Sequence, residues 1–363
     1  MKKYLFLATL VLFQIGKTES QISKKQLDNE LTELMAKEHI PGLAYAVIKD
    51  GKVLHKNALG KASVPFNVPV TNETVFQLAS CSKIYTALLL GRLFDLGLLK
   101  PDTTIKDLVD NIPEGWETIT IMHLAAHQSG IKIADFSKTN SPEEAFELAK
   151  TMPFEFETGE KSEYMSSDYW ILLYLIEKVT QLKYYDALRQ YVLEPLQLNH
   201  SFVNNPKFGM FTDLDIVPNQ AQEYHWFKNE NTLRINQMWF KETDYAAGGI
   251  YSSIDDMAKI AVSLDKKNFL SESSYNLIAN PLKLNNGQDG SYGLALVVRD
   301  YENHKIIEHS GGPALADFVK FEKEGYTFIV LTNNRGLFPY LSKLIASYYI
   351  KDLSKAGPPE GWE

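Results

Sequence analysis

The sequence contains very little cysteine. Cys81 is the only one among 363 residues, so the chain has no internal disulfide and its stability must come from packing. Cys81 follows Ser80 directly and is turned about a quarter of the way round the predicted helix. We interpret it as a small buried packing residue, with a thiol nucleophile as the alternative.

Positive charge is also scarce. Lys and Arg number 37 against 45 Asp and Glu, which gives a net charge of −8 at pH 7 and a pI near 5.6. This balance gives nucleic acid no electrostatic support, so we predict no nucleic-acid partner. Hydrophobic residues make up 45% of the chain and aromatic residues 12%, a composition that favours a packed core over disorder.

No hydrophobic run is long enough to span a membrane comfortably. At the N-terminus, Lys2 and Lys3 precede an apolar stretch from Tyr4 to Ile15, and a short polar segment ends at Ser20. This pattern is typical of a secretory signal peptide, with an uncleaved anchor as the alternative. We therefore predict that residues 1–20 are a signal peptide. The mature protein would be periplasmic or secreted, without stable membrane insertion.

The remaining residues, 21–363, predict a single α+β domain with two lobes. A hairpin around Asp50-Gly51 near the start and further strands after residue 293 enclose a mostly helical middle. The simplest closure joins both ends of the chain in one antiparallel sheet flanked by the terminal helices, with a cleft beside the helical lobe. We predict a sheet lobe of about residues 21–75 and 270–363 and a helical lobe of about residues 76–269.

The periodicity of apolar residues predicts the individual elements. Helical periods cover 24–38, 141–152, 169–181, 184–192, 253–265 and 339–351. Strand patterns cover 43–48, 53–55, 293–299, 305–309, 318–322 and 327–332.

The strongest chemical signal is Ser80 followed by Lys83 at the start of an apolar helix. Residues three apart share a helix face, so the Lys83 amine can lie beside the Ser80 hydroxyl. Apolar neighbours that exclude water lower the pKa of a lysine, and a neutral amine can accept a proton from serine. The unpaired N–H groups of the helix N-terminus add positive potential where an oxyanion would form. We therefore predict Ser80 as a nucleophile and Lys83 as its base.

The Ser-x-x-Lys pattern alone is weak, because it also occurs at Ser129–Lys132 and at Ser263–Lys266. Ser129 precedes a glycine and is typical of a loop. Lys266 comes near the end of a helix, where we expect it to be solvated. Only Ser80 begins a helix that is apolar enough to bury its lysine.

Two further segments can complete a site around Ser80. Tyr164-x-Ser166 precedes a predicted helix. Its phenol can pass a proton when a lysine ammonium stabilises the phenolate, and Ser166 can hold a substrate carbonyl or the Lys83 amine. At the end of a predicted strand stands His309-Ser310-Gly311-Gly312, where glycine lets a substrate approach the backbone and its N–H groups. Each segment also has a structural alternative, as a helix cap and as a turn.

These elements occur in the order found in serine β-lactamases and penicillin-binding proteins. The chain resembles this family, nearest its class C β-lactamases, D-Ala-D-Ala carboxypeptidases and related esterases, over most of residues 40–335. The matching segments are Ser80-x-x-Lys83, Tyr164-x-Ser166, His309-Ser310-Gly311 and the accessory stretches 123–130, 194–196 and 247–258.

The resemblance implies a serine hydrolase that forms an acyl-enzyme and needs no metal or cofactor. Ser80 would attack a carbonyl, and Lys83 and Tyr164 would move its proton. The Ser80 and Gly312 N–H groups would hold the oxyanion. The substrate-binding residues would be Ser166, His309, Ser310, Gly311 and Gly312, with His309 a polar or cationic group that binds a carboxylate.

Two positions depart from the family pattern, which usually has Tyr-x-Asn second and a lysine at the start of the third motif. Here Ser166 and His309 stand in those places, and a hydroxyl lacks the two-way hydrogen bonding of an amide. The substrate is therefore left open as a β-lactam, a D-Ala-D-Ala or D-amino-acid peptide, or an ester. A carboxylesterase and a catalytically silent binding protein of the same fold are the alternatives.

Three other patterns imitate functional motifs. His123 and His127 have the spacing of zinc ligands on a helix, but no third ligand is evident and we interpret them as packing residues. Glu194 begins a segment similar to the water-activating loop of class A β-lactamases, and we assign it to a structural helix end. The literal Tyr-x-Asn at Tyr301 falls in a predicted turn, and we dismiss it.

Overall fold

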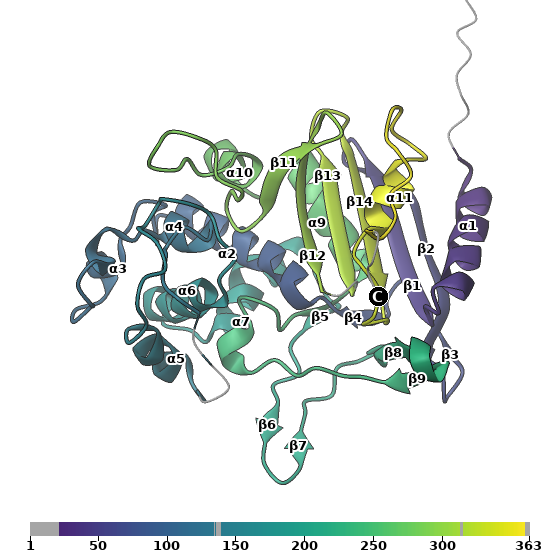
Figure 1. Ribbon diagram of the computed structural model, residues 1–363, viewed down its shortest axis with the longest axis horizontal. Helices are drawn as coiled ribbons and strands as arrows, with labels where there is room; N and C mark the ends of the chain where they lie inside the picture. Colours follow the sequence, from purple (N-terminus) through teal and green to yellow (C-terminus); the bar gives the residue numbers. More distant parts are fainter. Residues whose placement is uncertain (1–21, 134, 136–138, 313–314, 360–363) are drawn as a thin grey trace, which may run out of the picture.

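The structure, a computed structural model, describes residues 22–133, 135, 139–312 and 315–359 (Figure 1). The expected signal peptide, residues 1–20, lies outside the described residues. The rest of the chain forms an antiparallel sheet beside a group of helices, so the predicted α+β fold class is confirmed.

The main sheet joins the two ends of the described chain. Its strand order is β11-β12-β13-β14-β1-β2-β3, and β1 pairs with β14 in antiparallel register, with Ala44 opposite Leu331. The predicted closure between the first hairpin and the C-terminal strands is therefore confirmed. The strands are β1 (Gly42–Lys49), β2 (Lys52–Ser63), β3 (Val68–Pro69), β11 (Val297–Tyr301), β12 (His304–Gly311), β13 (Ala316–Phe321) and β14 (Tyr326–Thr332).

Alternating side chains on β1 separate two hydrophobic cores. Tyr45 and Val47 face the core beneath α1 (Lys24–Lys37) and α11 (Leu341–Ala346), whereas Ala46 and Ile48 face the larger core on the other side. A side chain of this size contributes about 1.5–3 kcal/mol when fully buried, so both faces must be covered. The same alternation on β12 sends Ile306 and Ile307 into different cores.

Helix α9 (Ile254–Lys266) covers the second face of the sheet. It packs against β1, β2 and β14, although its residues fall within the range predicted for the helical lobe, 76–269. Its Asp265 forms a buried ion pair with Lys320 of β13. The structure therefore differs from the predicted lobe boundary. An amphipathic pattern identifies a helix but does not show which partner surface takes its apolar stripe.

The helical lobe is built around α2 (Lys83–Asp95) and α6 (Ser166–Thr180), both largely buried. Helix α6 starts at Ser166, three residues earlier than predicted, so Ser166 belongs to its first turn. Shorter helices surround the pair: α3 (Ile105–Leu108), α4 (Ile121–Ala125), α5 (Pro142–Ala149), α7 (Tyr184–Leu188), α8 (Glu194–Leu196) and α10 (Glu272–Ala279).

Residues 201–253 form strands and loops where the sequence predicted a mostly helical region with long loops. A small sheet of β4 (Val75–Gln77), β10 (Tyr251–Ser253) and β5 (Ser201–Phe202) leads directly into the segment that carries Ser80. Two hairpins extend below the sheet in Figure 1: β6 (Lys207–Phe208) with β7 (Thr212–Asp213), and β8 (Tyr224–Phe227) with β9 (Thr232–Ile235).

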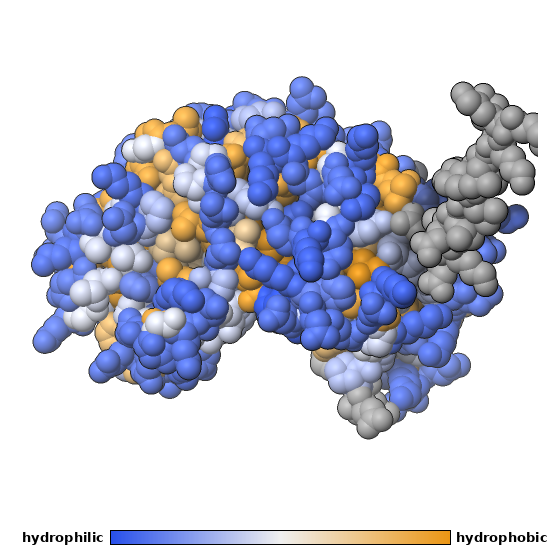
Figure 2. Space-filling view, turned by 90° about the horizontal axis from the view of Figure 1, so that it is seen from above, coloured by the Kyte–Doolittle hydropathy of each residue, from blue (hydrophilic) through white to orange (hydrophobic). Residues whose placement is uncertain are grey.

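The surface seen from above is mostly polar, and its apolar side chains occur in small separate groups (Figure 2). Within the described ranges, every helix is too short or too polar to cross a bilayer.

Candidate active site

Ser80 lies in a tight turn between β4 and α2. It belongs to a 3₁₀ turn, Ala79–Ser82, which runs directly into α2. The preceding residue, Ala79, has a φ of 45°, a left-handed conformation that a residue with a Cβ adopts only at a cost of about 1–3 kcal/mol. The Ser82 hydroxyl accepts a hydrogen bond from the Ile250 N–H at 3.0 Å and so ties the turn to the neighbouring loop. Packing therefore holds Ser80 in a strained, fixed position.

Lys83 is almost completely removed from water. Lys83 is 1% exposed, and its Nζ lies 4.7 Å from the centre of the Tyr169 ring. The Nζ donates to the Tyr164 Oη at 2.6 Å and to the Ala247 carbonyl at 2.8 Å. Lys83 is therefore buried, as the sequence predicted, and hydrogen bonds to two oxygen atoms fix the direction of its amine.

Tyr164 joins the lysine to the serine. Its Oη lies 2.9 Å from the Ser80 Oγ and 2.6 Å from the Lys83 Nζ. In the part of the chain that the structure describes, no hydrogen bond joins Ser80 directly to Lys83. The sequence placed the amine beside the serine, whereas the structure places the phenol between them. The three groups thus form one proton path that ends in a dry interior.

His127 supports Tyr164 from behind. Its ring lies 4.6 Å from the Tyr164 ring, and its Nδ1 accepts the Met165 N–H at 3.1 Å. Burial, followed by the charge of Lys83, holds the pKa of His127 well below its ordinary value, so the ring is neutral. Since Nδ1 accepts, the proton of the neutral ring is on Nε2. Sequence reasoning had assigned this residue to packing only.

A buried acid lies behind His127. Asp168 on α6 is fully buried, and one of its oxygen atoms lies 3.3 Å from the His127 Nδ1. Its other oxygen takes a short hydrogen bond from the Ser129 hydroxyl. Desolvation raises the pKa of the Asp168 carboxyl well above its ordinary value, which favours the neutral acid. The sequence signals that pointed towards this cluster are the accessory stretch 123–130, which contains His127, and its Ser129-Gly130 pair.

The zinc alternative for His123 and His127 finds no support among the described residues, where no group of three potential ligands comes together. His123 faces the N-terminus of its own helix, and its Nδ1 accepts the Thr120 N–H at 3.2 Å.

Ser166 stands at the first position of α6, directly before the buried residues that begin at Ser167. It is partly exposed, and among the described residues its hydroxyl has no hydrogen-bond partner. The expected contact between Ser166 and the Lys83 amine is therefore not formed. The Ala247 carbonyl occupies that place on the lysine.

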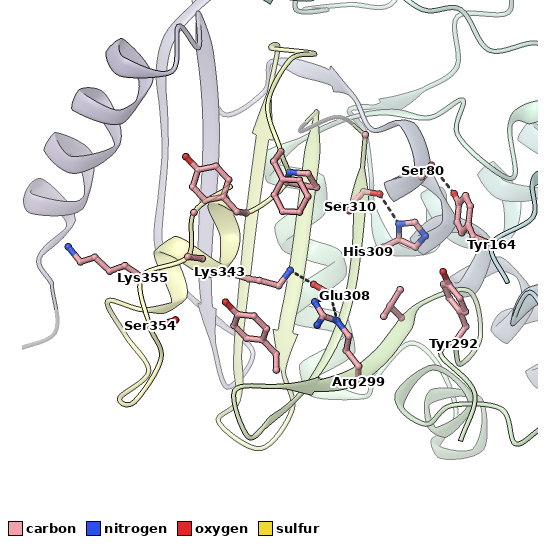
Figure 3. A pocket seen from close by; sticks show the side chains of 18 residues that line it. Ser80, Tyr164, Tyr292, Arg299, Glu308, His309, Ser310, Lys343, Ser354 and Lys355 are labelled. Carbon is pink, nitrogen blue, oxygen red and sulfur yellow. Dashed lines mark hydrogen bonds and ion pairs between the residues drawn. The ribbon is translucent and has the colours of Figure 1, made fainter. Parts of the chain in front are cut away.

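His309 projects from the end of β12 towards Ser80 and Tyr164 (Figure 3). Its Nδ1 lies 2.9 Å from the Ser310 carbonyl oxygen, and its Nε2 is buried without a partner. Burial, followed by the charge of Lys83, lowers the pKa of His309 to about 3. The ring is therefore neutral at pH 7, which revises the expectation of a cationic group at this position.

Two neighbouring glycines at the strand end differ sharply in their surroundings. A Cβ on Gly311 would lie 1.8 Å from the Leu78 carbonyl oxygen, so only glycine lets β12 approach the turn that carries Ser80. A Cβ on Gly312 would meet no described atom within 4 Å. Gly311 therefore serves the packing, and Gly312 presents open backbone beside the serine.

A cavity of about 680 Å³ opens beside Ser80 and extends along β11 and β12 (Figure 3). Tyr292 lines it near Ser80. Farther along, Glu308 holds two cations: the Arg299 Nε donates to it at 2.7 Å, and Lys343 of α11 pairs with its other oxygen. Ser310 and Gly312 also line this cavity, so the strand end and Ser80 share one space.

The remaining sequence patterns take no part in the hydrogen bonds that join Ser80, Tyr164 and Lys83, although Tyr301 also lines the cavity. Cys81 is buried, its Sγ donates to the His309 carbonyl at 3.4 Å, and burial raises the pKa of its thiol well above the ordinary value. Glu194 is exposed at the start of α8 and pairs with Arg189. Tyr301 ends β11, and Asn303 is in the following turn. None of these residues contributes a side chain to the Ser80–Tyr164–Lys83 path.

Comparisons with known proteins cover most of the chain. The family model described as Beta-lactamase matches residues 27–348. A "Beta-lactamase" of Escherichia coli (strain K12) is 28% identical over 265 residues, which are 70% of this chain and 66% of that protein, just under two thirds. "Penicillin-binding protein 4*" of Bacillus subtilis (strain 168) is 24% identical over 334 residues, covering 86% of this chain and 72% of that protein.

Solved structures share the same fold. The octameric penicillin-binding protein homologue from Pyrococcus abyssi superposes with a TM-score of 0.74 at 24% identity, covering 92% of this chain and 79% of that one. A D-amino acid amidase from Ochrobactrum anthropi SV3 superposes with a TM-score of 0.70 at 19% identity, covering 86% of this chain and 91% of that one. At these identities the likeness concerns the fold.

Proposed function

Because this chain belongs to the beta-lactamase family of serine hydrolases, we propose that it cleaves an amide or ester through an acyl-enzyme on Ser80. The observation that carries the proposal is the path Ser80–Tyr164–Lys83, with distances of 2.9 and 2.6 Å and a lysine that is 1% exposed. Such a path can accept the proton of a serine hydroxyl as a general base.

The acylation step uses this path in both directions. The Lys83–Tyr164 pair, holding one proton fewer than its full complement, takes the proton of the Ser80 hydroxyl. The Ser80 Oγ forms a bond to the substrate carbonyl carbon, and collapse of the tetrahedral intermediate breaks the bond to the leaving group. The leaving oxygen or nitrogen departs with the proton from the pair, and Ser80 is left as an ester.

The negative charge that develops on the carbonyl oxygen needs donors at the strand end. We propose that the backbone N–H groups of Ser80 and Gly312 supply them. The close approach of Gly311 to Leu78 supports this role, since it brings the two segments together. Removing one such donor typically costs about a hundred- to a thousandfold in rate. Water then attacks the acyl carbon and gives a proton to the same pair. The bond from that carbon to the Ser80 Oγ breaks, the pair returns the proton to Ser80, and the acid is released.

The substrate class proposed here includes a D-amino-acid peptide, a D-Ala-D-Ala stem, a β-lactam and an ester. The relatives named for β-lactamase and penicillin-binding activity and the D-amino acid amidase of similar fold support this range. No metal or cofactor takes part in the proposed chemistry, because the nucleophile, the proton path and the oxyanion donors all come from the chain.

Intact-protein mass spectrometry tests the acyl-enzyme. The protein is exposed separately to a fluorescent penicillin, to a p-nitrophenyl ester and to a fluorophosphonate. We expect a single covalent adduct on Ser80 with the fluorophosphonate and with at least one acyl donor. Labelling by penicillin favours a peptidase or β-lactamase, whereas ester turnover with poor penicillin labelling favours the carboxylesterase alternative.

Two variants provide the controls for this experiment. Ser80→Ala should abolish every adduct. Ser263→Ala removes the serine of another Ser-x-x-Lys pattern, whose hydroxyl donates only within its own helix, and should label like the parent. An unchanged adduct on Ser80→Ala, or a folded parent protein that no reagent labels, would favour the catalytically silent binding protein instead.

We further propose that the chain is exported and loses residues 1–20. The two lysines and the apolar run that follows them support this reading. Expression in a bacterium should yield a mature N-terminus at Gln21 outside the cytoplasm. Leu10→Arg, which interrupts the apolar run, should leave the precursor uncleaved. A mature protein that keeps its first twenty residues inside the cell contradicts the proposal.

A further inference from the structure

The two ring nitrogens of His309 have different hydrogen-bonding roles. Nδ1 lies 2.9 Å from the Ser310 carbonyl, and a carbonyl oxygen can only accept, so Nδ1 must carry the proton. In a neutral ring the other nitrogen then bears a lone pair. That nitrogen, Nε2, is buried and has no partner among the described residues. The ring therefore presents an unsatisfied acceptor.

The position of this acceptor is fixed by the sheet. His309 pairs with Phe318 of β13, and the Cys81 thiol donates to its carbonyl at 3.4 Å. The side chain is 6% exposed and lines the cavity together with Ser80 and Tyr164. Its ring centre lies 6.4 Å from that of Tyr164. A substrate bound to Ser80 therefore passes next to Nε2.

The charged groups around His309 keep the ring neutral. Lys83 is the cation that acts on it, and Tyr164 and His127 are its other titratable neighbours. Glu308, an acid that lines the cavity, does not offset the charge of Lys83. It points to the opposite face of the same strand and forms ion pairs with Arg299 and Lys343. A second proton on His309 would thus place two cations in one dry space.

We propose that His309 acts as a hydrogen-bond acceptor for the substrate and selects groups that carry an N–H donor over groups that carry a carboxylate. The inference rests on the proposed acyl-enzyme function and names its substrate class: uncharged amides or esters with a donor next to the reacting carbonyl. An N–H satisfies the buried lone pair of Nε2. A carboxylate places a second acceptor against it and leaves both unpaired.

The cations farther along the cavity do not reverse this preference. Arg299 and Lys343 both bind the carboxylate of Glu308. A third cation of the cavity, Lys355, lies over the Tyr348 ring, away from His309 (Figure 3). Beside Ser80, the His309 Nε2 is a buried acceptor that the described residues leave unpaired.

A matched pair of boronic acids tests the inference. 3-Carbamoylphenylboronic acid and 3-carboxyphenylboronic acid differ in one donor group and in charge, and both can add to a serine nucleophile. Their inhibition constants are measured as protection of Ser80 from the fluorophosphonate. We expect the amide to bind the parent protein at least about tenfold more tightly, the ratio that one satisfied hydrogen bond commonly gives.

Three variants sharpen this comparison. His309→Lys replaces the acceptor by a cation and should reverse the preference, so that the carboxylate binds more tightly. His309→Gln keeps a neutral acceptor of similar reach and should retain the preference for the amide, which keeps the test open if the lysine variant does not fold. His304→Lys adds the same charge on the same strand, where the parent histidine pairs with Glu324, and should leave the ratio unchanged.

The outcomes separate the two proposals. If the fluorophosphonate does not label Ser80 in the parent protein, the acyl-enzyme function fails. If labelling succeeds but the parent binds the two boronic acids equally, including failure of both, or prefers the carboxylate, only the acceptor role of His309 is overturned.

Discussion

The two walls of the active site are built on opposite principles. On the helical wall the groups that connect Ser80 to Lys83 are paired: Lys83 contacts two oxygens and Tyr164 joins it to Ser80, while behind them the His127 Nδ1 accepts the Met165 N–H and its Nε2 is left unpaired. On the strand wall the groups are held rigidly but left open, since the His309 Nε2 is unpaired and Gly312 borders free space. Each wall contains a buried polar side chain, Lys83 on one and His309 on the other, so burial alone does not distinguish them.

The difference assigns separate tasks to the walls. A paired network in a water-poor interior can move a proton without reorganising, which suits activation of the nucleophile. An unpaired group in the same environment costs free energy until a ligand satisfies it, which suits recognition. We infer that chemistry resides in the helical lobe and selectivity at the end of β12.

The largest effect on activity is expected from removing the Lys83 amine from the helical wall. Lys83→Met keeps the apolar length of the side chain and removes the amine. We expect kcat/KM for an activated ester to fall about a thousandfold, because the proton path loses its terminus. The melting temperature should not fall, since a dry cation without an acidic partner is removed. Lys266→Met, in the solvated counterpart motif, should leave the rate unchanged, and a comparable loss there would contradict the assignment.

On the strand wall, we expect a substitution at Gly311 to destabilise the fold and a substitution at Gly312 to be tolerated. Gly311→Ala drives a methyl group into the Leu78 carbonyl, and we expect a loss of about 3 kcal/mol in the free energy of unfolding. Gly312→Ala meets open space and should change stability by less than about 0.5 kcal/mol. Urea denaturation of the two variants measures the contrast. Equal losses would mean that β12 does not fit tightly against the Ser80 turn.

The pH dependence of stability should carry the signature of His309. Its folded pKa, about 3, lies below the ordinary value near 6.5, so the unfolded chain binds more protons between these values. The stability contributed by the neutral ring is therefore lost as pH falls below about 6.5. The difference in unfolding free energy between the parent and His309→Gln should shrink by up to about 1.4 kcal/mol per pH unit in that window. A difference independent of pH would argue against a buried neutral ring.

Asp168 should give the opposite slope from within the helical wall. Its pKa is raised by burial, so the folded protein binds the extra proton above about pH 4, the ordinary value for aspartate. Stability from this acid is present at low pH and is lost as pH rises. The parent should therefore lose stability relative to Asp168→Asn as pH rises from 4 to 7. Thermal unfolding of both proteins across this range measures it, and Ser263→Ala serves as a control without a titrating group.

Much of the arrangement could be predicted from local patterns. Three short motifs located Ser80, Tyr164 and His309, and alternating or helical periodicity located β1, β14 and α1. These features depend on neighbours in sequence, so the residue types carry the information.

The rest depends on contacts between distant segments. The order of the path, with Tyr164 between Ser80 and Lys83, follows from how the loop before α6 lies against the turn that carries Ser80, 84 residues away in sequence. The neutral state of His309 follows from the depth to which β12 is buried, which no residue near position 309 encodes. The partner of α9 could not be predicted for the same reason: its apolar stripe fits either lobe, and only the packed structure shows that it lies against the sheet.

The pairing of β1 with β14 has a consequence for how the molecule is made. These strands form the middle of the sheet, yet they lie near opposite ends of the chain. The centre of the sheet can therefore form only after almost the whole chain has been synthesised. Contacts of such sequence separation form slowly, because a long loop must first be closed. The emerging polypeptide therefore remains without a finished core until late in synthesis, and a chain stopped before residue 326 leaves β1 as a bare edge that invites aggregation.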